Sequence, residues 1–438
     1  MEVYTLYNKQ VDNLINKKLE MVVDVLKDST PNVCSIILAG GYGKGEGIIK
    51  KTSNKIELVS DFDIFVITDS RLSNKIMKHI YQKIKKKISH YDEEIEIDVR
   101  YFEKNKLKKV APILRFYDLK YASKVIYGDD VRGLIPIPKE QNLPVYEGVR
   151  LLFNRIGFFA EWFSLKEIKT ADKKLKHKLV MESTKTYSIC CQALNILMRY
   201  YQPKLTDCVS GMNTKLNKTY PGFYNKNNEL VNKIIYFTEI RLKYDEDKIN
   251  NIENPEKLWL DSIADLLIIT KFFLEQFAGI NGWDEAYKKV SKIYLKEHVD
   301  YISSKRWHIK ISNFLFNLLS TIYQARANMG WFFKVLYNNK KFYLKALADY
   351  RDPVIKIYFS GLFAMLSIKS NRINKNYFDK SVYYLKKAYP FCLKGKDDLE
   401  QFDSLFGNFR DAHKLRLCLK KFATLHKDNM IITFRNFN

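Results

Sequence analysis

Residues 33–47 read Val-Cys-Ser-Ile-Ile-Leu-Ala-Gly-Gly-Tyr-Gly-Lys-Gly-Glu-Gly, an apolar run that passes directly into glycines. The run from Val33 to Leu38 predicts a buried strand, and Gly40-Gly41 at its end predicts a tight turn. Small residues in such a turn let backbone N–H groups approach phosphate oxygens closely. The glycines match neither the G-K-[ST] of a P-loop nor the spacing G-x-G-x-x-G. This stretch therefore predicts a phosphate-binding turn of another kind, with a flexible loop as the alternative.

Two carboxylates open the next apolar run, residues 60–67, which reads Ser-Asp-Phe-Asp-Ile-Phe-Val-Ile. Side chains two positions apart in a strand point to the same side of the sheet. Asp61 and Asp63 can therefore share divalent metal ions. An Asp-x-Asp pattern alone is a weak signal, because many solvated strand ends contain one, so its partners decide the interpretation.

A third acidic position comes from residues 94–100, Glu-Ile-Glu-Ile-Asp-Val-Arg. The apolar residues Ile95, Ile97 and Val99 alternate with polar ones, which predicts a strand with one apolar and one polar face. Asp98 is the preferred third carboxylate and Glu96 the reserve. The alternative is that these acids are ordinary solvent-facing charges.

Helical spacing of apolar residues surrounds these strands and fills the rest of the chain. It predicts a first helix from Val11 to Leu26 and another after Ser73, with Ser73 as its N-cap. Prolines punctuate residues 133–145, which predicts a linker. Beyond it the pattern is helical, with helices expected at residues 146–163, 173–201, 229–244 and 258–277.

The predicted fold class is α+β, a small mixed β-sheet domain followed by a large all-helical region. The expected domains are residues 1–135, 146–280 and 281–438. The segment from Ser312 to Ile368 is rich in aromatics and lysine, so it is either an RNA-facing surface or core, and helical spacing favours core.

Composition limits the classes of partner and metal. The 438 residues carry a net charge of +25, which favours polyanionic partners such as nucleic acid or triphosphates, although lysines scattered over a solvated surface also explain it. No apolar run approaches the roughly 20 residues of a membrane-spanning helix, and the N-terminus lacks the order of a secretory signal. We expect no membrane partner and a cytoplasmic location.

Cysteine and histidine usage argues against a zinc site. The six cysteines form no C-x-x-C pair, and the seven histidines form no H-E-x-x-H. We therefore expect reduced, buried thiols and any metal to be held by carboxylates.

Taken together, Gly40-Gly41 at a strand end, Asp61-x-Asp63 opening the next strand and Asp98 in a third resemble the polymerase-β-type nucleotidyltransferase superfamily. Residues 40–46 are similar to the Gly-Ser-x-x-x-Gly-Glu loop of its minimal and aminoglycoside-type members. The resemblance covers roughly residues 8–130. Gly41 departs from the usual Ser, and the interval between Gly47 and Ser60 is longer and richer in lysine, which suggests an inserted hairpin or loop.

The resemblance implies a metal-dependent transfer of a nucleoside monophosphate from a triphosphate, with release of pyrophosphate. It implies that Asp61, Asp63 and Asp98 are catalytic and hold two Mg²⁺ ions, for which Mn²⁺ is an alternative. The backbone of Gly40, Gly41, Tyr42 and Gly43 would bind the β- and γ-phosphates. Lys44 is a further nucleotide-binding candidate if its side chain turns inward, as is Lys178, with Lys174 and Lys185 as its alternatives.

Three hypotheses about function remain, and the first two differ in the molecule that accepts the nucleotide. A transferase acting on a hydroxyl of a small molecule or protein, with ATP as donor, is slightly favoured by the glycine loop. An RNA or tRNA nucleotidyltransferase is favoured by the net charge and the basic, aromatic helices. A non-catalytic relative used for nucleotide binding or scaffolding is the third alternative, and the intact aspartates count against it.

Overall fold

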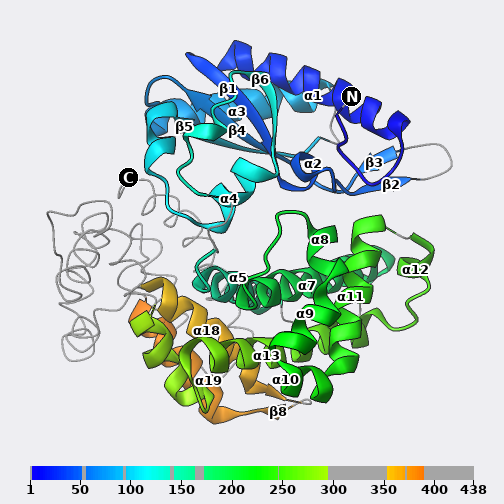
Figure 1. The fold of residues 1–438 in the computed structure, drawn as a ribbon, viewed down its shortest axis with the longest axis vertical. Coiled ribbons are helices and arrows are strands. Elements are labelled where there is room, and N and C mark those ends of the chain that lie inside the picture. The colour runs from blue at the N-terminus through cyan, green and yellow to red at the C-terminus, as the bar shows by residue number, and fades with distance from the viewer. Residues whose placement is uncertain are drawn as a thin grey trace, which may run out of the picture. The chain divides into compact units, whose positions relative to one another are not determined.

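The computed structural model describes residues 2–51, 56–91, 95–138, 143–162, 172–244, 246–293, 353–369 and 372–388, coloured in Figure 1. The chain divides into two compact units, each built from two segments. The first unit holds Met1–Gly148 and Lys173–Ser262, and the second holds Val149–Asp172 and Ile263–Asn438. The domain boundaries expected from the sequence do not coincide with this division and stay predictions.

A mixed four-stranded sheet lies in the first unit, in the order β5-β4-β1-β6. Its strands are β1 (Val33–Ala39), β4 (Phe62–Thr68), β5 (Ile97–Glu103) and β6 (Lys124–Gly128). Strand β4 runs parallel to β5, whereas β1 is antiparallel to both β4 and β6. This confirms the expected small mixed sheet near the N-terminus.

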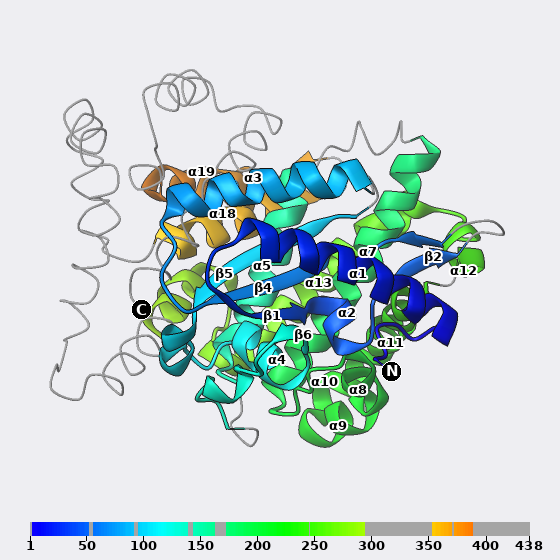
Figure 2. The same cartoon turned by 90° about the horizontal axis from the view of Figure 1, so that it is seen from above.

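Two long helices, α1 (Lys9–Ser29) and α3 (Asn74–Tyr91), cover one face of this sheet, as Figures 1 and 2 show. Each begins at a capping side chain: the Val11 N–H donates to Asn8 Oδ1 at 3.2 Å, and the Ile76 N–H donates to Ser73 Oγ at 3.3 Å. The predicted N-cap at Ser73 is therefore confirmed. Both helices bury apolar residues in one core with side chains of the sheet, among them Ile15, Leu19, Val22, Ile80, Ile84, Ile36, Leu38, Phe62, Ile64 and Val66.

This core fixes the direction of the remaining strand residues. Because Phe62 and Ile64 point toward the helices, Asp63 between them points to the opposite face of the sheet. The same alternation in β5 places Asp98 on that opposite face, since Ile97 and Val99 pack against the helical core.

The glycine stretch forms a short helix, α2 (Gly40–Lys44), where the sequence suggested a turn or loop. Gly40 starts it with φ +65° and Gly45 ends it with φ +79°, both in the region that favours glycine. The lysine-rich interval that follows holds the antiparallel pair β2 (Ile49–Lys51) and β3 (Ile56–Leu58), so the hairpin interpretation of this interval is confirmed.

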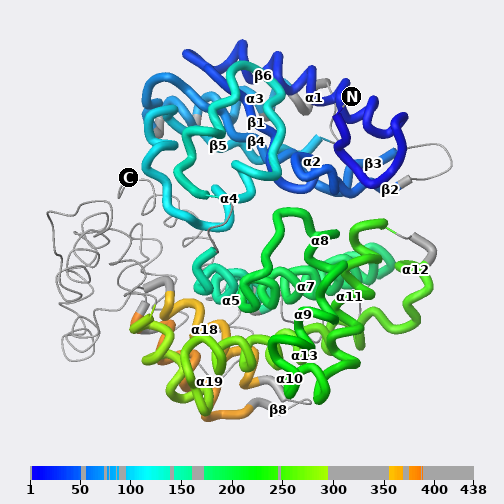
Figure 3. Tube along the Cα trace, viewed as in Figure 1, coloured from blue at the N-terminus to red at the C-terminus, as the bar shows by residue number. Residues whose placement is uncertain are grey.

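The rest of the described chain is almost entirely helical, and the coloured tube of Figure 3 traces it. The expectation of an all-helical region is wrong in one detail, the short antiparallel pair β7 (Ile368–Lys369) and β8 (Arg372–Ile373). The remaining elements of the first unit are η1 (Lys104–Lys109), α4 (Leu114–Tyr121), η2 (Arg132–Leu134), α7 (Lys173–Leu197), α8 (Leu205–Ser210), α9 (Met212–Thr219), α10 (Pro221–Lys226), α11 (Asn228–Lys243) and α12 (Glu246–Asn250). Those that lie wholly or largely in the second unit are α5 (Tyr146–Trp162), α13 (Pro255–Ala278), α18 (Pro353–Ser367) and α19 (Lys375–Ala388).

Helix α18 covers the described end of the aromatic segment 312–368. It buries Ile355, Phe359, Leu362 and Phe363, so the core interpretation is confirmed there, and residues 312–352 lie outside the described residues. Within the part of the chain that the structure describes, no helix combines the length and apolar character needed to cross a membrane.

Candidate functional site

Strand register brings Asp63 and Asp98 together. The two residues are direct partners in the parallel pair β4–β5, and Asp63 is also the partner of Ala39, the last residue of β1. Partners in adjacent strands present their side chains on the same face. Two of the three predicted carboxylates therefore converge where β1 meets α2, on the face that α1 and α3 leave uncovered.

One guanidinium bridges these two carboxylates. Arg100 Nη1 lies 3.3 Å from Asp63 Oδ1, while its Nη2 contacts Asp98 Oδ2. The guanidinium also lies over the Phe65 ring, 5.6 Å from its centroid. The sequence analysis gave Arg100 no role, although its position two residues after Asp98 places both on one face of β5.

Gly40 permits this arrangement, because the Asp63 carboxylate lies directly against it. A Cβ built on Gly40 would be 2.2 Å from Asp63 Oδ2, a distance that no side chain tolerates. Positive φ and lack of space both require glycine here. The predicted glycine bend and the predicted carboxylate are therefore in contact.

Burial and like charge set the ionisation of Asp63. They raise its pKa to about 6: burial contributes most, followed by the Asp61 carboxylate, and Asp98 adds to the rise. The positive charges of Arg100 and Arg115 oppose it. Asp63 therefore lies near Asp98 and Arg100 on β5, Asp61 just before β4 and Arg115 on α4, and burial together with the two negative charges outweighs the two positive ones.

The third predicted carboxylate, Asp61, lies outside the pair formed by Asp63 and Asp98. Asp61 is exposed just before β4, near enough for its charge to act on Asp63. Glu96, the reserve candidate, is exposed before β5 begins, so the register favours Asp98. Among the described residues, no group of three or more His, Cys, Asp or Glu side chains is arranged to hold a metal ion. What the structure does bring together is the pair Asp63 and Asp98, bridged by the Arg100 guanidinium.

Tyr42 is a core residue. Its side chain is fully buried, its ring lies 4.9 Å from that of Phe62, and its hydroxyl donates to the Ile48 carbonyl at 3.2 Å. A Cβ on Gly47 would be only 2.0 Å from the same ring. Only the backbone of Tyr42 is left for the predicted contact with phosphate.

Lys44 forms a largely buried ion pair with Asp118. Its Nζ lies 2.6 Å from Asp118 Oδ2, and the two side chains are 11% and 18% exposed. The predicted role in nucleotide binding required the Lys44 side chain to turn inward. It does turn inward, but its ammonium pairs with the Asp118 carboxylate on α4. The Asp118 carboxylate therefore neutralises the positive charge that the sequence analysis expected Lys44 to offer to the nucleotide.

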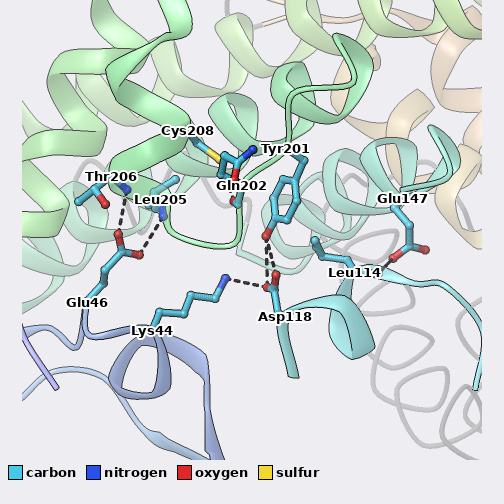
Figure 4. A network of polar contacts seen from close by, with 10 residues as sticks. All are labelled: Lys44, Glu46, Leu114, Asp118, Glu147, Tyr201, Gln202, Leu205, Thr206 and Cys208. Atoms are coloured by element: carbon cyan, nitrogen blue, oxygen red, sulfur yellow. Dashed lines mark hydrogen bonds and ion pairs between the residues drawn. The ribbon is translucent and has the colours of Figure 1, made fainter. Parts of the chain in front are cut away.

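Figure 4 shows how this pair belongs to a polar network that the sequence analysis missed. The Tyr201 hydroxyl donates to both Asp118 oxygens, at 3.0 and 3.2 Å. Burial raises the pKa of Asp118, and the Lys44 ammonium opposes this rise. Nearby, Glu147 Oε2 accepts from the Leu114 N–H at 2.8 Å and so caps α4, the helix that carries Asp118.

Glu46 makes the second connection in Figure 4. Its carboxylate accepts hydrogen bonds from the backbone N–H groups of Leu205 (2.9 Å) and Thr206 (2.8 Å), the first residues of α8. The glycine stretch is thereby attached at both Lys44 and Glu46 to segments of the first unit distant in sequence. In the sequence, the Gly-Glu step that ends the motif at residues 40–46 was the only indication that Glu46 has a role.

Lys178 lies exposed on α7, as do Lys174 and Lys185. Its role in nucleotide binding stays a prediction. Comparison with protein-family models finds no match for this chain, and comparison with curated proteins finds none either.

Proposed function

We propose that this chain is a metal-dependent nucleotidyltransferase that moves a nucleoside monophosphate, AMP by preference, from a triphosphate to a hydroxyl of a small-molecule or protein acceptor. The acceptor hydroxyl would lose its proton to solvent, and its oxygen would form a bond to the α-phosphorus while the bond from that phosphorus to the oxygen shared with the β-phosphate breaks, which releases pyrophosphate. The observation that carries the proposal is the pairing of Asp63 with Asp98 in register, with the Asp63 carboxylate against Gly40.

The carboxylates of this site are ligands of the type that magnesium prefers. Mg²⁺ prefers carboxylate oxygens and water, and Asp61, Asp63 and Asp98 would supply those oxygens. The Arg100 guanidinium bridges two of these three carboxylates, and Arg115 on α4 is a second positive charge that acts on Asp63. When bound, two Mg²⁺ or Mn²⁺ ions would neutralise charge on the triphosphate and on the attacking oxygen.

The chain's own residues would position the substrate. The backbone from Gly40 to Gly43 would bind the β- and γ-phosphates, because α2 begins beside the Asp63 carboxylate. The Glu46 and Lys44 attachments would hold α2 in place, so Lys44 is proposed as a positioning residue. Lys178 is kept as a candidate contact to the phosphates.

Labelled nucleotides test this proposal. The protein is incubated with each α-labelled nucleoside triphosphate and Mg²⁺, together with a metabolite extract, a protein extract or cellular RNA, and the labelled product is identified. We expect label on a small molecule or protein from ATP, and at least a hundredfold less with Asp63→Asn, because a metal ligand is lost. Asp69→Asn, an exposed change at the other end of β4, is the matched control.

Two other functions compete. An RNA or tRNA acceptor is favoured by the net charge of +25 and would put the label on RNA, with salt-sensitive RNA binding. A non-catalytic nucleotide-binding relative is favoured by the Arg100 bridge, since a guanidinium already contacts both carboxylates. No transfer from any triphosphate, with nucleotide binding indifferent to Asp61→Ala, would favour that relative and contradict the proposal.

A further inference from the structure

Arg100 occupies the position between the two aspartates that a shared cation would take. It belongs to β5 itself, two residues beyond Asp98, and its guanidinium contacts one oxygen of each carboxylate. The arginine side chain is 30% exposed, as against 26% for Asp63 and 43% for Asp98. The bridge is therefore partly buried, and solvent reaches it from one side.

Chemistry limits how this bridge opens. A guanidinium stays protonated at every physiological pH, so Arg100 does not leave by losing its charge. It leaves only when another cation takes its place or when its partners are neutralised. A divalent ion bound by Asp63 and Asp98 carries twice its charge and would use the same two carboxylates.

We infer that Arg100 is a tethered cation that competes with the divalent metal for Asp63 and Asp98. The inference rests on the proposed function, because it concerns the metal site of that function. In the absence of metal, the guanidinium holds the two carboxylates together and lowers their mutual repulsion. Metal binding releases it, and this release lowers the apparent affinity for the metal.

Mn²⁺ binding measures this competition directly. Free Mn²⁺ gives a characteristic electron paramagnetic resonance signal that disappears on binding, so the full-length protein can be titrated at neutral pH without nucleotide. We expect Arg100→Gln to bind Mn²⁺ about five- to tenfold more tightly than the wild type, the scale of a partly buried ion pair removed from competition. A merely structural arginine would not produce tighter binding when it is removed.

Two further variants complete the design. Arg100→Lys keeps the charge but offers a single point contact, so its Mn²⁺ affinity should fall between those of the wild type and Arg100→Gln. It also serves if Arg100→Gln fails to fold. Arg132→Gln removes another ion-paired arginine of the first unit, whose Nη2 lies 2.6 Å from Asp130 Oδ2, and should leave Mn²⁺ affinity unchanged.

The outcomes separate this inference from the proposed function. Equal or weaker Mn²⁺ binding by Arg100→Gln, with binding by the wild type, overturns the inference and leaves the function standing. Binding by Arg100→Gln alone supports the inference and overturns the function, because the wild-type site is then blocked. Binding by neither protein overturns both.

Discussion

Replacing Asp63 with asparagine is expected to stabilise the metal-free protein. The residue's pKa of about 6 lies above the ordinary carboxyl value of 3.8, because burial and the charges of Asp61 and Asp98 disfavour its ionised form. A rise of that size corresponds to about 3 kcal/mol of cost to the folded state once the carboxyl is ionised. Because the side chain is 26% exposed and paired with Arg100, we expect about 2 kcal/mol after screening by solvent.

The direction of the pH dependence follows from the raised pKa. Below about pH 3 the carboxyl is protonated in both the folded and the unfolded protein, so asparagine and aspartic acid should be equivalent. As the pH rises through 4 to 6, the unfolded state ionises first, and the wild type loses stability that Asp63→Asn retains. Above about pH 7 the full difference should be present.

Thermal unfolding with a metal chelator present gives the assay. At about pH 8, Asp63→Asn should raise the melting temperature of the transition that includes the sheet by roughly 4 to 8 °C, and near pH 4 by only a small part of that. Asp69→Asn, exposed at the opposite end of β4, should change it little at either pH. A lower melting temperature for Asp63→Asn at about pH 8 would refute the claim that Asp63 is an incompletely compensated charge.

Three further changes test the packing around the glycine bend, each by chemical denaturation. Gly40→Ala should cost about 2–3 kcal/mol, since its Cβ collides with Asp63 and its φ is positive, whereas Gly133→Ala, with open space around it, should be nearly neutral. Lys44→Met should cost about 3 kcal/mol because it leaves Asp118 buried without its cation, and adding Asp118→Asn should restore part of that loss. Glu46→Ala should cost about 1–2 kcal/mol through the lost cap of α8, and an effect below 0.5 kcal/mol would contradict the hydrogen bonds drawn in Figure 4.

Periodic features of the sequence predicted most of the fold. Helical spacing located α1, α3, α7, α11 and α13 to within a few residues at most ends, and the alternation of Ile95, Ile97 and Val99 identified the β5 strand. The same alternation selected Asp98 because it fixes the side of the sheet on which a residue lies. Local pattern was sufficient in these cases since each element buries one continuous apolar face.

Such local patterns could not predict contacts between segments that are distant in sequence. Nothing near Lys44 in sequence indicates that its partner is Asp118, 74 positions away, or that Tyr201 completes the pair. Tyr42 stands inside a glycine motif, yet its ring fills space that Gly47 leaves open. The placement of these residues depends on tertiary packing, which a single sequence does not display. The triphosphate, the acceptor and a cytoplasmic location stay predictions.

The central claim is that Asp63 and Asp98 hold a divalent metal beside the glycine bend. Crystals grown with Mn²⁺ and a non-hydrolysable triphosphate, measured at a wavelength where manganese scatters anomalously, test it most directly. We predict an anomalous peak within coordination distance of both carboxylates, with Arg100 withdrawn from them. Density that shows Arg100 still bridging Asp63 and Asp98, and no anomalous peak beside them, would contradict the account.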